Sequence, residues 1–352
     1  MSELNSFQKT LRKENTERPP VWFMRQAGRY HSHYQGLRKK YSFIDLCKIP
    51  EVACEVTMGP INEFNFDAAI LFSDLLFPLE EMGMGLRYEP GPKLDWYLKE
   101  KTDLSRLKSG ASLAKGLQYQ ADAMKLIRKT LSPEKGLLGF VGGPLTLYFY
   151  AVAGSHQSST PEMWKTALDG MKNGLYLGFC EKLEDFLAEN MALQARAGAD
   201  TVAMLDTCGG EVDVDTYSEI VRPTIDRVLK KYHAIVSNVP VTYYSKGTDE
   251  RYWKTLVDSP IAAIGVDWRV DLAQTLDRWS DRFVIQGNID PDWMLLPANQ
   301  LEEKVRAVFS KVKALPASKR RGWVSGLGHG VLQTTPESNV HLWLKIQKEM
   351  FS

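Results

Sequence analysis

The sequence predicts an α/β fold in the form of a single-domain (β/α)8 TIM barrel. Three observations predict it: eight short apolar runs recur along the 352 residues, a polar or glycine-rich turn follows each, and helical patterns fill the intervals. Eight strands that alternate with helices are typical of a parallel α/β architecture. A closed barrel is the leading interpretation, and a doubly wound sheet is the alternative.

The candidate strands are defined by β-branched and aromatic residues between turn-forming residues. They cover residues 21–24, 66–72, 137–141, 201–205, 239–244, 261–266, 282–285 and 322–325. Apolar residues at helical spacing predict helices within 164–196, 217–232 and 301–315. Thr160 and Thr335 each precede a proline and a glutamate, a pattern typical of a capped helix start.

We expect a polar N-terminal extension over residues 1–18 and a catalytic barrel domain over 19–352. The extension has no apolar core of the kind that a secretory signal requires. The uncharged stretch 136–154 has the length of a membrane span, but Gly142, Gly143 and Pro144 interrupt it. A buried strand, a turn and a helix start explain this stretch better, so we expect no membrane association.

Charge and cysteine content narrow the function classes. Lysine and arginine number 44 against 43 acidic residues, a net charge of +1, so no global field favours nucleic acid or an anionic membrane. The four cysteines show no CxxC spacing. A disulfide framework or zinc ribbon is therefore not expected, and a reducing cytoplasm is the default location.

In a TIM barrel the active site lies at the carboxyl ends of the strands. Arg25, Gln26 and Arg29 follow the first apolar run, with Gly28 allowing close backbone approach. Two guanidinium groups four residues apart suit a ligand with several carboxylates or phosphates, so we expect an anion-binding loop. A solvated turn is the alternative.

Other strand ends supply further candidates. Ser73 and Asp74 follow the second run, and Asp74 is either a helix N-cap or a carboxylate facing a cationic or N–H-bearing group. Tyr150, beyond the third run, is a packing residue or a site residue. His329 lies between two glycines, which favours a functional imidazole. The chain contains no P-loop, no HExxH and no GxSxG motif.

Seven segments together resemble the uroporphyrinogen decarboxylase family, in order and over most of the chain. They read PVWFMRQAGRY, AAILFSD, GFVGGPLTLYFY, AGADTVAMLDTCGG, GVDW, QGNIDP and GLGHG. The resemblance implies a (β/α)8 barrel that acts as a homodimer in the cytoplasm, without metal or organic cofactor. It also implies a small-molecule substrate, uroporphyrinogen III, whose four acetate arms become methyl groups to give coproporphyrinogen III in haem biosynthesis.

The resemblance also implies roles for individual residues. Arg25 and Arg29 match carboxylate-binding arginines, Asp74 matches the aspartate that faces the pyrrole N–H groups, and Tyr150 and His329 match site residues. Expected substrate contacts beyond these are Arg38, Gln26, Ile70, Phe72, Ser73, Phe140 and Thr207.

A protonated pyrrole can itself act as the electron sink for loss of CO2, and a fixed carboxylate would stabilise its positive charge. Two alternatives remain: a zinc- and cobamide-dependent methyltransferase on the same fold, and a non-catalytic tetrapyrrole-binding protein. The sequence departs from the usual family pattern at residues 31–33, Leu145, Cys208, Arg269 and Gly326. We expect these changes to fall near the substrate cleft.

Overall fold

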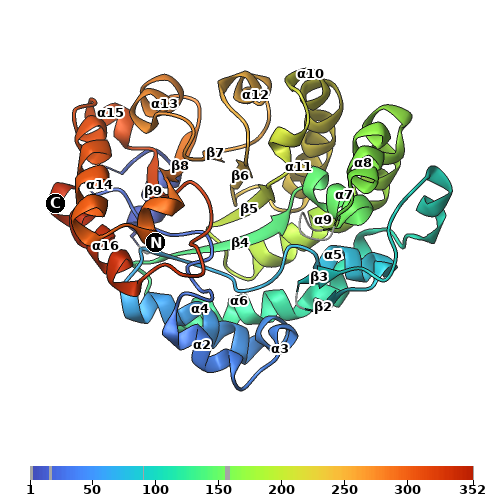
Figure 1. Ribbon diagram of the computed structural model, residues 1–352, viewed down its shortest axis with the longest axis horizontal. Helices are drawn as coiled ribbons and strands as arrows, with labels where there is room; N and C mark the ends of the chain where they lie inside the picture. The colour runs from blue at the N-terminus through green and yellow to red at the C-terminus, as the bar shows by residue number, and fades with distance from the viewer. Residues whose placement is uncertain (1–2, 16–17, 90, 155–158, 352) are drawn as a thin grey trace.

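A computed structural model describes residues 3–15, 18–89, 91–154 and 159–351, and it shows a parallel α/β barrel (Figure 1). Seven strands pair in parallel in the spatial order β1-β4-β5-β6-β7-β8-β9. They are β1 (Ala68–Ile70), β4 (Gly136–Gly142), β5 (Thr201–Asp206), β6 (Val241–Ser245), β7 (Ala263–Gly265), β8 (Val284–Ile289) and β9 (Trp323–Leu327). Seven of the eight expected strands are confirmed, with bounds shifted by a few residues.

The eighth expected strand, at 21–24, is not a strand. Val21 forms only an isolated parallel bridge to Ser325 of β9. The Ser325 amide donates to the Pro20 carbonyl (2.9 Å), and the Asp67 amide, just before β1, donates to the Val21 carbonyl (2.9 Å). This segment therefore joins the two edge strands at a narrow seam, because the chain turns at Met24 before a ladder can form.

Helices surround the strands, with α14 and α16 on one side and α8, α9 and α11 on the other (Figure 1). Their bounds are α1 (Ser6–Leu11), α2 (Ser32–Arg38), α3 (Phe43–Lys48), α4 (Pro50–Phe64), α5 (Phe77–Leu79), α6 (Gln118–Thr130), α7 (Pro144–Ala153), α8 (Pro161–Asn173), α9 (Leu175–Arg196), α10 (Val214–Thr216), α11 (Arg222–Ile235), α12 (Glu250–Thr255), α13 (Leu272–Trp279), α14 (Ala298–Lys313), α15 (Ala317–Arg320) and α16 (Glu337–Phe351). A short antiparallel hairpin, β2 (Arg87–Tyr88) with β3 (Pro92–Lys93), lies outside the barrel sheet.

Helix starts and stops agree in part with the sequence patterns. The Thr160 hydroxyl accepts from the Met163 amide (3.2 Å), which confirms the cap of α8. Thr335 does not cap α16, since its buried hydroxyl has no hydrogen-bond partner among the described residues. The expected helix over 164–196 is two helices, because Gly174 adopts a left-handed conformation (φ 87°) between α8 and α9.

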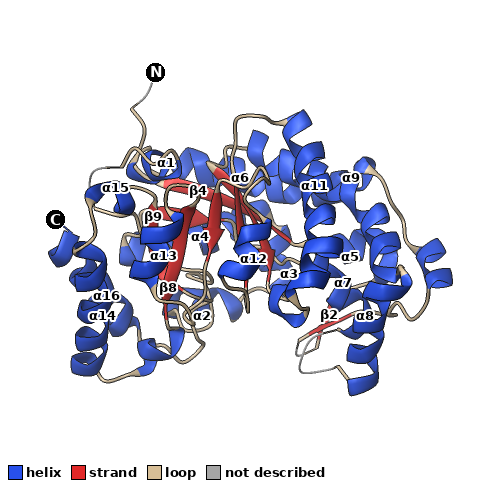
Figure 2. Ribbon diagram, turned by 90° about the horizontal axis from the view of Figure 1, so that it is seen from above, coloured by secondary structure: helices blue, strands red, loops and turns tan. Residues whose placement is uncertain are grey.

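The barrel interior is an apolar cluster to which alternate residues of the strands contribute, as the two-residue period requires. It contains Trp22, Met24, Ala68, Leu138, Phe140, Ala203, Leu205, Tyr244, Ala263, Val284 and Val324. Phe7 of α1 joins this cluster and is 1% exposed. Helix α1 lies at one end of the strands and α2 at the other (Figure 2), so α1 closes the end opposite the arginine loop.

The uncharged stretch 136–154 forms the buried strand β4 and the helix α7, as expected. In the part of the chain that the structure describes, no helix is both long and apolar enough to span a membrane. Residues 1–2 and 16–17 of the expected N-terminal extension lie outside the described residues.

Candidate active site

A cleft of about 600 Å³ opens at the carboxyl ends of the strands on one side of the barrel. Its lining comes from α2, the start of α3 and the β2–β3 hairpin, and from four segments around the barrel: the loop after the seam, the turn after β1, helix α7 beyond β4, and the loop after β9. Because these elements are neighbours around the barrel, residues distant in sequence meet here. The residues expected from sequence that line this cleft are Arg25, Arg29, Arg38, Phe72, Ser73, Asp74 and Tyr150.

Three arginines line this cleft and carry its positive charge. Arg25 has a left-handed backbone (φ 61°), which is uncommon for a residue with a side chain and is typical of functional sites. Among the described residues, neither Arg25 nor Arg29 forms an ion pair with a carboxylate. Arg38 uses one nitrogen, Nη1, to donate to the Tyr41 carbonyl (2.6 Å). Guanidinium groups without a protein counter-ion are available for an anionic ligand.

Asp74 is the carboxylate of this cleft. Its Oδ1 accepts from the Leu76 amide (2.8 Å), so it stabilises its own turn and lines the cleft as well. Burial raises the pKa of Asp74, while the Leu76 amide, the Tyr88 hydroxyl and the Arg25 charge act in the opposite direction. A desolvated carboxylate gains most from a cationic or N–H-bearing ligand group.

Tyr150 reaches the cleft from α7, and a buried aspartate fixes the start of that helix. Asp206, at the end of β5, accepts from the Thr146 amide (2.7 Å) and the Thr146 hydroxyl (2.8 Å). Tyr243 donates to its other oxygen (3.2 Å). Burial raises the pKa of Asp206 to about 6 despite these hydrogen bonds. Asp206 therefore positions α7 without lining the cleft.

His329 lies behind Arg25. Its ring stacks between Tyr244 (centroids 6.0 Å apart) and Trp268 (6.4 Å), and its buried Nδ1 has no hydrogen-bond partner among the described residues. Burial lowers the pKa of His329 to about 4, and the positive charges of Arg25 and Lys246 add to the effect. The imidazole is therefore neutral near pH 7 and can donate or accept a hydrogen bond.

The glycine after His329 determines where Arg25 can lie. A Cβ at Gly330 would sit 2.5 Å from Cδ of Arg25, so the arginine packs against the bare backbone of this loop. The cleft thus combines the carboxylate of Asp74 with three guanidinium groups, and His329, an expected site residue, does not line it. Chemically, this arrangement suits a large ligand with acidic arms around an N–H-bearing or cationic centre.

Comparison with known proteins assigns a family to this site. The family model described as Uroporphyrinogen decarboxylase (URO-D) matches residues 3–350. The chain belongs to the uroporphyrinogen decarboxylase family. The family match covers every segment that forms the cleft, from the arginine loop to the loop after β9.

Curated relatives agree with this membership, and a solved structure shares the fold. A uroporphyrinogen decarboxylase from Sorangium cellulosum is 35% identical over 95% of this chain and 93% of its own length. One from Geobacter metallireducens is 34% identical, with 93% of each chain covered. A methyltransferase from Methanosarcina mazei has a TM-score of 0.76 at 17% identity, over 99% of this chain and 100% of its own. At that identity it supports the fold alone.

Some residues that family membership suggested as substrate contacts do not line the cleft. Gln26 is buried beneath it and donates to the Ala68 carbonyl (3.1 Å), which ties the arginine loop to β1. Ile70 and Phe140 belong to the apolar cluster of the barrel interior, under the cleft residue Leu75. Thr207 lies half-buried in the turn after β5.

Sequence reasoning missed the support behind Ser73. Gln120 of α6 donates to the Ser73 hydroxyl (3.0 Å), and Gln194 of α9 donates in turn to Gln120 (3.2 Å). Gln194 also accepts from the Phe140 amide (2.7 Å) and fits only because residue 139 is a glycine. Both glutamines occupy buried positions of long helices, where the sequence pattern predicts packing residues. No local sequence signal therefore indicates that they support a cleft residue.

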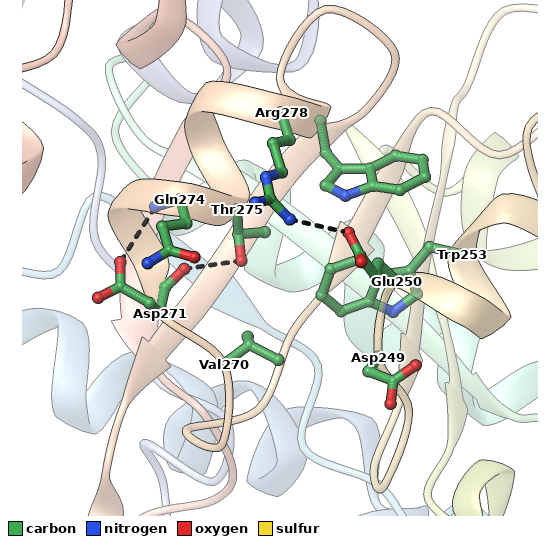
Figure 3. Close-up of a pocket in the computed structure, with 9 residues that line it drawn as sticks. Asp249, Glu250, Trp253, Val270, Asp271, Gln274, Thr275 and Arg278 are labelled. Atoms are coloured by element: carbon green, nitrogen blue, oxygen red, sulfur yellow. Dashed lines mark hydrogen bonds and ion pairs between the residues drawn. The ribbon is translucent and has the colours of Figure 1, made fainter.

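A second hollow, of about 190 Å³, lies between α12 and α13 (Figure 3). Its carboxylates already form ion pairs or a helix cap. Glu250 pairs with Arg278 (3.2 Å), Asp249 pairs with Arg251 (2.7 Å), and Asp271 caps α13 through the Gln274 amide (3.0 Å). We assign it a packing role. Among the described residues, no group of three or more His, Cys, Asp or Glu side chains is placed to hold a metal ion.

Proposed function

We propose that this protein is a uroporphyrinogen decarboxylase, which converts the four acetate arms of uroporphyrinogen III to methyl groups and yields coproporphyrinogen III. One observation carries the proposal: the desolvated carboxylate of Asp74 shares a cleft with the guanidinium groups of Arg25, Arg29 and Arg38. A tetrapyrrole presents N–H groups at its centre and carboxylates at its rim, which matches this distribution of charge. Family membership supports the same substrate.

The reaction requires a place for the electrons of the broken bond. Protonation of a pyrrole at the α carbon makes the ring cationic. Heterolysis of the bond between the acetate methylene and its carboxylate then releases CO2, and the electron pair neutralises the ring as an exocyclic methylene. A proton converts that methylene to a methyl group, and loss of the α proton restores the pyrrole.

Asp74 stabilises the cationic intermediate. A fixed carboxylate in a partly desolvated cleft is worth far more to a developing positive charge than one in water. The arginines hold the reacting acetate and its neighbours in place, which reduces the entropic part of the barrier. Tyr150 and the neutral His329 orient arginines or substrate carboxylates by hydrogen bonds. The ring is its own electron sink, so we propose no cofactor.

Family membership also supports a proposal about the pathway, the cellular location and the assembly of the protein. We propose that the protein acts in haem biosynthesis, in the cytoplasm, as a homodimer. Light scattering coupled to size-exclusion chromatography measures the assembly directly. A mass of one chain, 39.9 kDa, at micromolar concentration would contradict the homodimer.

Incubation with anaerobically reduced uroporphyrinogen III, followed by chromatography for the four-carboxylate product, tests the proposed reaction. We expect Asp74→Asn to reduce turnover by about 10²–10³-fold, the effect of removing one electrostatic stabiliser. The variant Asp122→Asn makes the same chemical change at a solvent-exposed carboxylate of helix α6 and should retain wild-type turnover. Product formation by Asp74→Asn at the wild-type rate would remove Asp74 from the mechanism.

The same assay separates the alternatives. Tight binding of reduced uroporphyrinogen without release of CO2 would favour a tetrapyrrole carrier. Stoichiometric zinc in the purified protein would favour the methyltransferase alternative. No observation on the described residues favours either one.

A further inference from the structure

Tyr88 lines the same cleft as Asp74 but comes from a different kind of element. It ends β2 of the short hairpin, paired with Pro92 of β3, and no barrel strand leads into it. Its ring packs on Phe43 (centroids 4.6 Å apart), and Phe43 contacts Phe72 of the cleft wall (6.1 Å). Aromatic packing therefore fixes the ring and leaves the hydroxyl as its one polar group.

The Tyr88 hydroxyl is buried and has no hydrogen-bond partner among the described residues. A buried phenol ordinarily finds a partner, because an unmade hydrogen bond carries the full desolvation cost. The charge of Asp74 is, after burial, the largest influence that raises the pKa of Tyr88. In return, the Tyr88 hydroxyl favours the ionised form of Asp74. Tyr88 and Asp74 also line the same cleft.

Asp74 has a carboxylate oxygen, Oδ2, that can accept a further hydrogen bond. The Leu76 amide occupies Oδ1, and no hydrogen bond reaches Oδ2 from the described part of the chain. A carboxylate has about four lone-pair sites, so one backbone contact leaves it under-coordinated. A donor on the Oδ2 side would hold the carboxylate ionised and fix its orientation.

We propose that Tyr88 is a positioning residue, whose hydroxyl donates a hydrogen bond to Asp74 and holds the carboxylate toward the centre of the bound ring. The inference deepens the proposed function and rests on it for its catalytic meaning. Tyr88 acts through Asp74, and the bonds that change during decarboxylation remain those described above.

The test is Tyr88→Phe, which keeps the aromatic packing and removes only the hydroxyl. A hydrogen bond to a charged group is worth enough to move a pKa by about one unit. Its loss raises the pKa of Asp74, so the acid limb of kcat/KM for reduced uroporphyrinogen should move up by about one pH unit. At pH values on the acid side of the profile, kcat/KM of the variant should be about tenfold lower than that of wild type. At higher pH, where kcat/KM no longer changes with pH, the difference should be smaller.

Tyr119→Phe is the matched control. It also removes a buried hydroxyl without a partner among the described residues, but Tyr119 packs on Phe77 and does not line the cleft. Its acid limb should coincide with that of wild type. An unmoved acid limb in Tyr88→Phe would overturn the proposal. So would a rise in KM alone, because a direct contact with substrate would then explain Tyr88.

A second measurement needs no turnover. In protein labelled with ¹³C at the aspartate carboxyl carbons, the Asp74 resonance is the one that Asp74→Asn removes. Its titration midpoint should be about one unit higher in Tyr88→Phe than in wild type, and unchanged in Tyr119→Phe. Equal midpoints in all three proteins would refute the contact. If the wild type releases no CO2, the proposed function fails while this titration still decides whether Tyr88 holds Asp74.

Discussion

Replacement of Gly330 by alanine should displace Arg25 without unfolding the barrel. The new Cβ would lie 2.5 Å from Cδ of Arg25 and 2.9 Å from Cγ, whereas ordinary contact begins at 3.4 Å. The flexible side chain must therefore move by about 1 Å, and such a misplacement of a positioning group can cost about 100-fold in rate. We expect kcat/KM for reduced uroporphyrinogen to fall by that factor, about 2.7 kcal/mol of transition-state stabilisation.

A double-mutant cycle tests whether the effect passes through Arg25. If it does, Gly330→Ala should add little in an Arg25→Ala background, because the displaced group is already absent. Gly36→Ala is the control, since a Cβ there meets nothing within 4 Å and Gly36 is exposed on helix α2. Wild-type kinetics in Gly330→Ala would refute the packing argument, as would an undiminished loss in the Arg25→Ala background.

Two further predictions concern the barrel interior and the imidazole. Phe7→Ala should lower the free energy of unfolding, measured with urea, by about 3–5 kcal/mol, because it leaves a cavity at the closed end of the barrel. Lys9→Ala on the same helix should lower it far less. Equal losses in the two variants would contradict the role of Phe7. An NMR titration should place the pKa of His329 near 4 and higher in Arg25→Ala, since a neighbouring positive charge is removed. Because that pKa lies below the unfolded value of 6.5, His329 favours folding fully above pH 6.5, and this contribution should decline as the pH falls toward 4. If the pKa of His329 is the same in Arg25→Ala as in wild type, the charge of Arg25 does not affect the imidazole.

The residues that follow strands were predictable from sequence. Asp74 could be predicted because it follows an apolar run that forms β1, and the carboxyl ends of parallel strands converge. The run before Arg25 forms only the seam, and Tyr150 lies within α7, where the family resemblance rather than a strand end assigned it. The direction of a side chain within its turn was not predictable. Gln26 lies between Arg25 and Gly28, which both line the cleft, yet Gln26 is buried and donates to the Ala68 carbonyl.

Tertiary placement also explains what the sequence patterns missed. Tyr88 reaches the cleft from a hairpin outside the βα repeat, so no strand-end rule could assign it. The departures at residues 31–33, which we expected near the cleft, are packing positions at least in part. His31 is 1% exposed and packs on Phe64 (centroids 5.1 Å apart), and His33 fits against Gly59 of α4. Neither histidine lines the cleft.

The seam at Val21 has a consequence for how the cleft can adapt. Every other junction between neighbouring strands is a ladder, whereas this one has a single bridge, a few flanking backbone hydrogen bonds, and side-chain hydrogen bonds of Asp67 and Gln26. The arginine loop begins three residues later, so it is attached where the barrel is least cross-linked. Local opening at this junction would carry Arg25 and Arg29 with it and leave the seven-stranded ladder intact. The positions of the two guanidinium groups therefore depend on this junction rather than on the strand ladder itself.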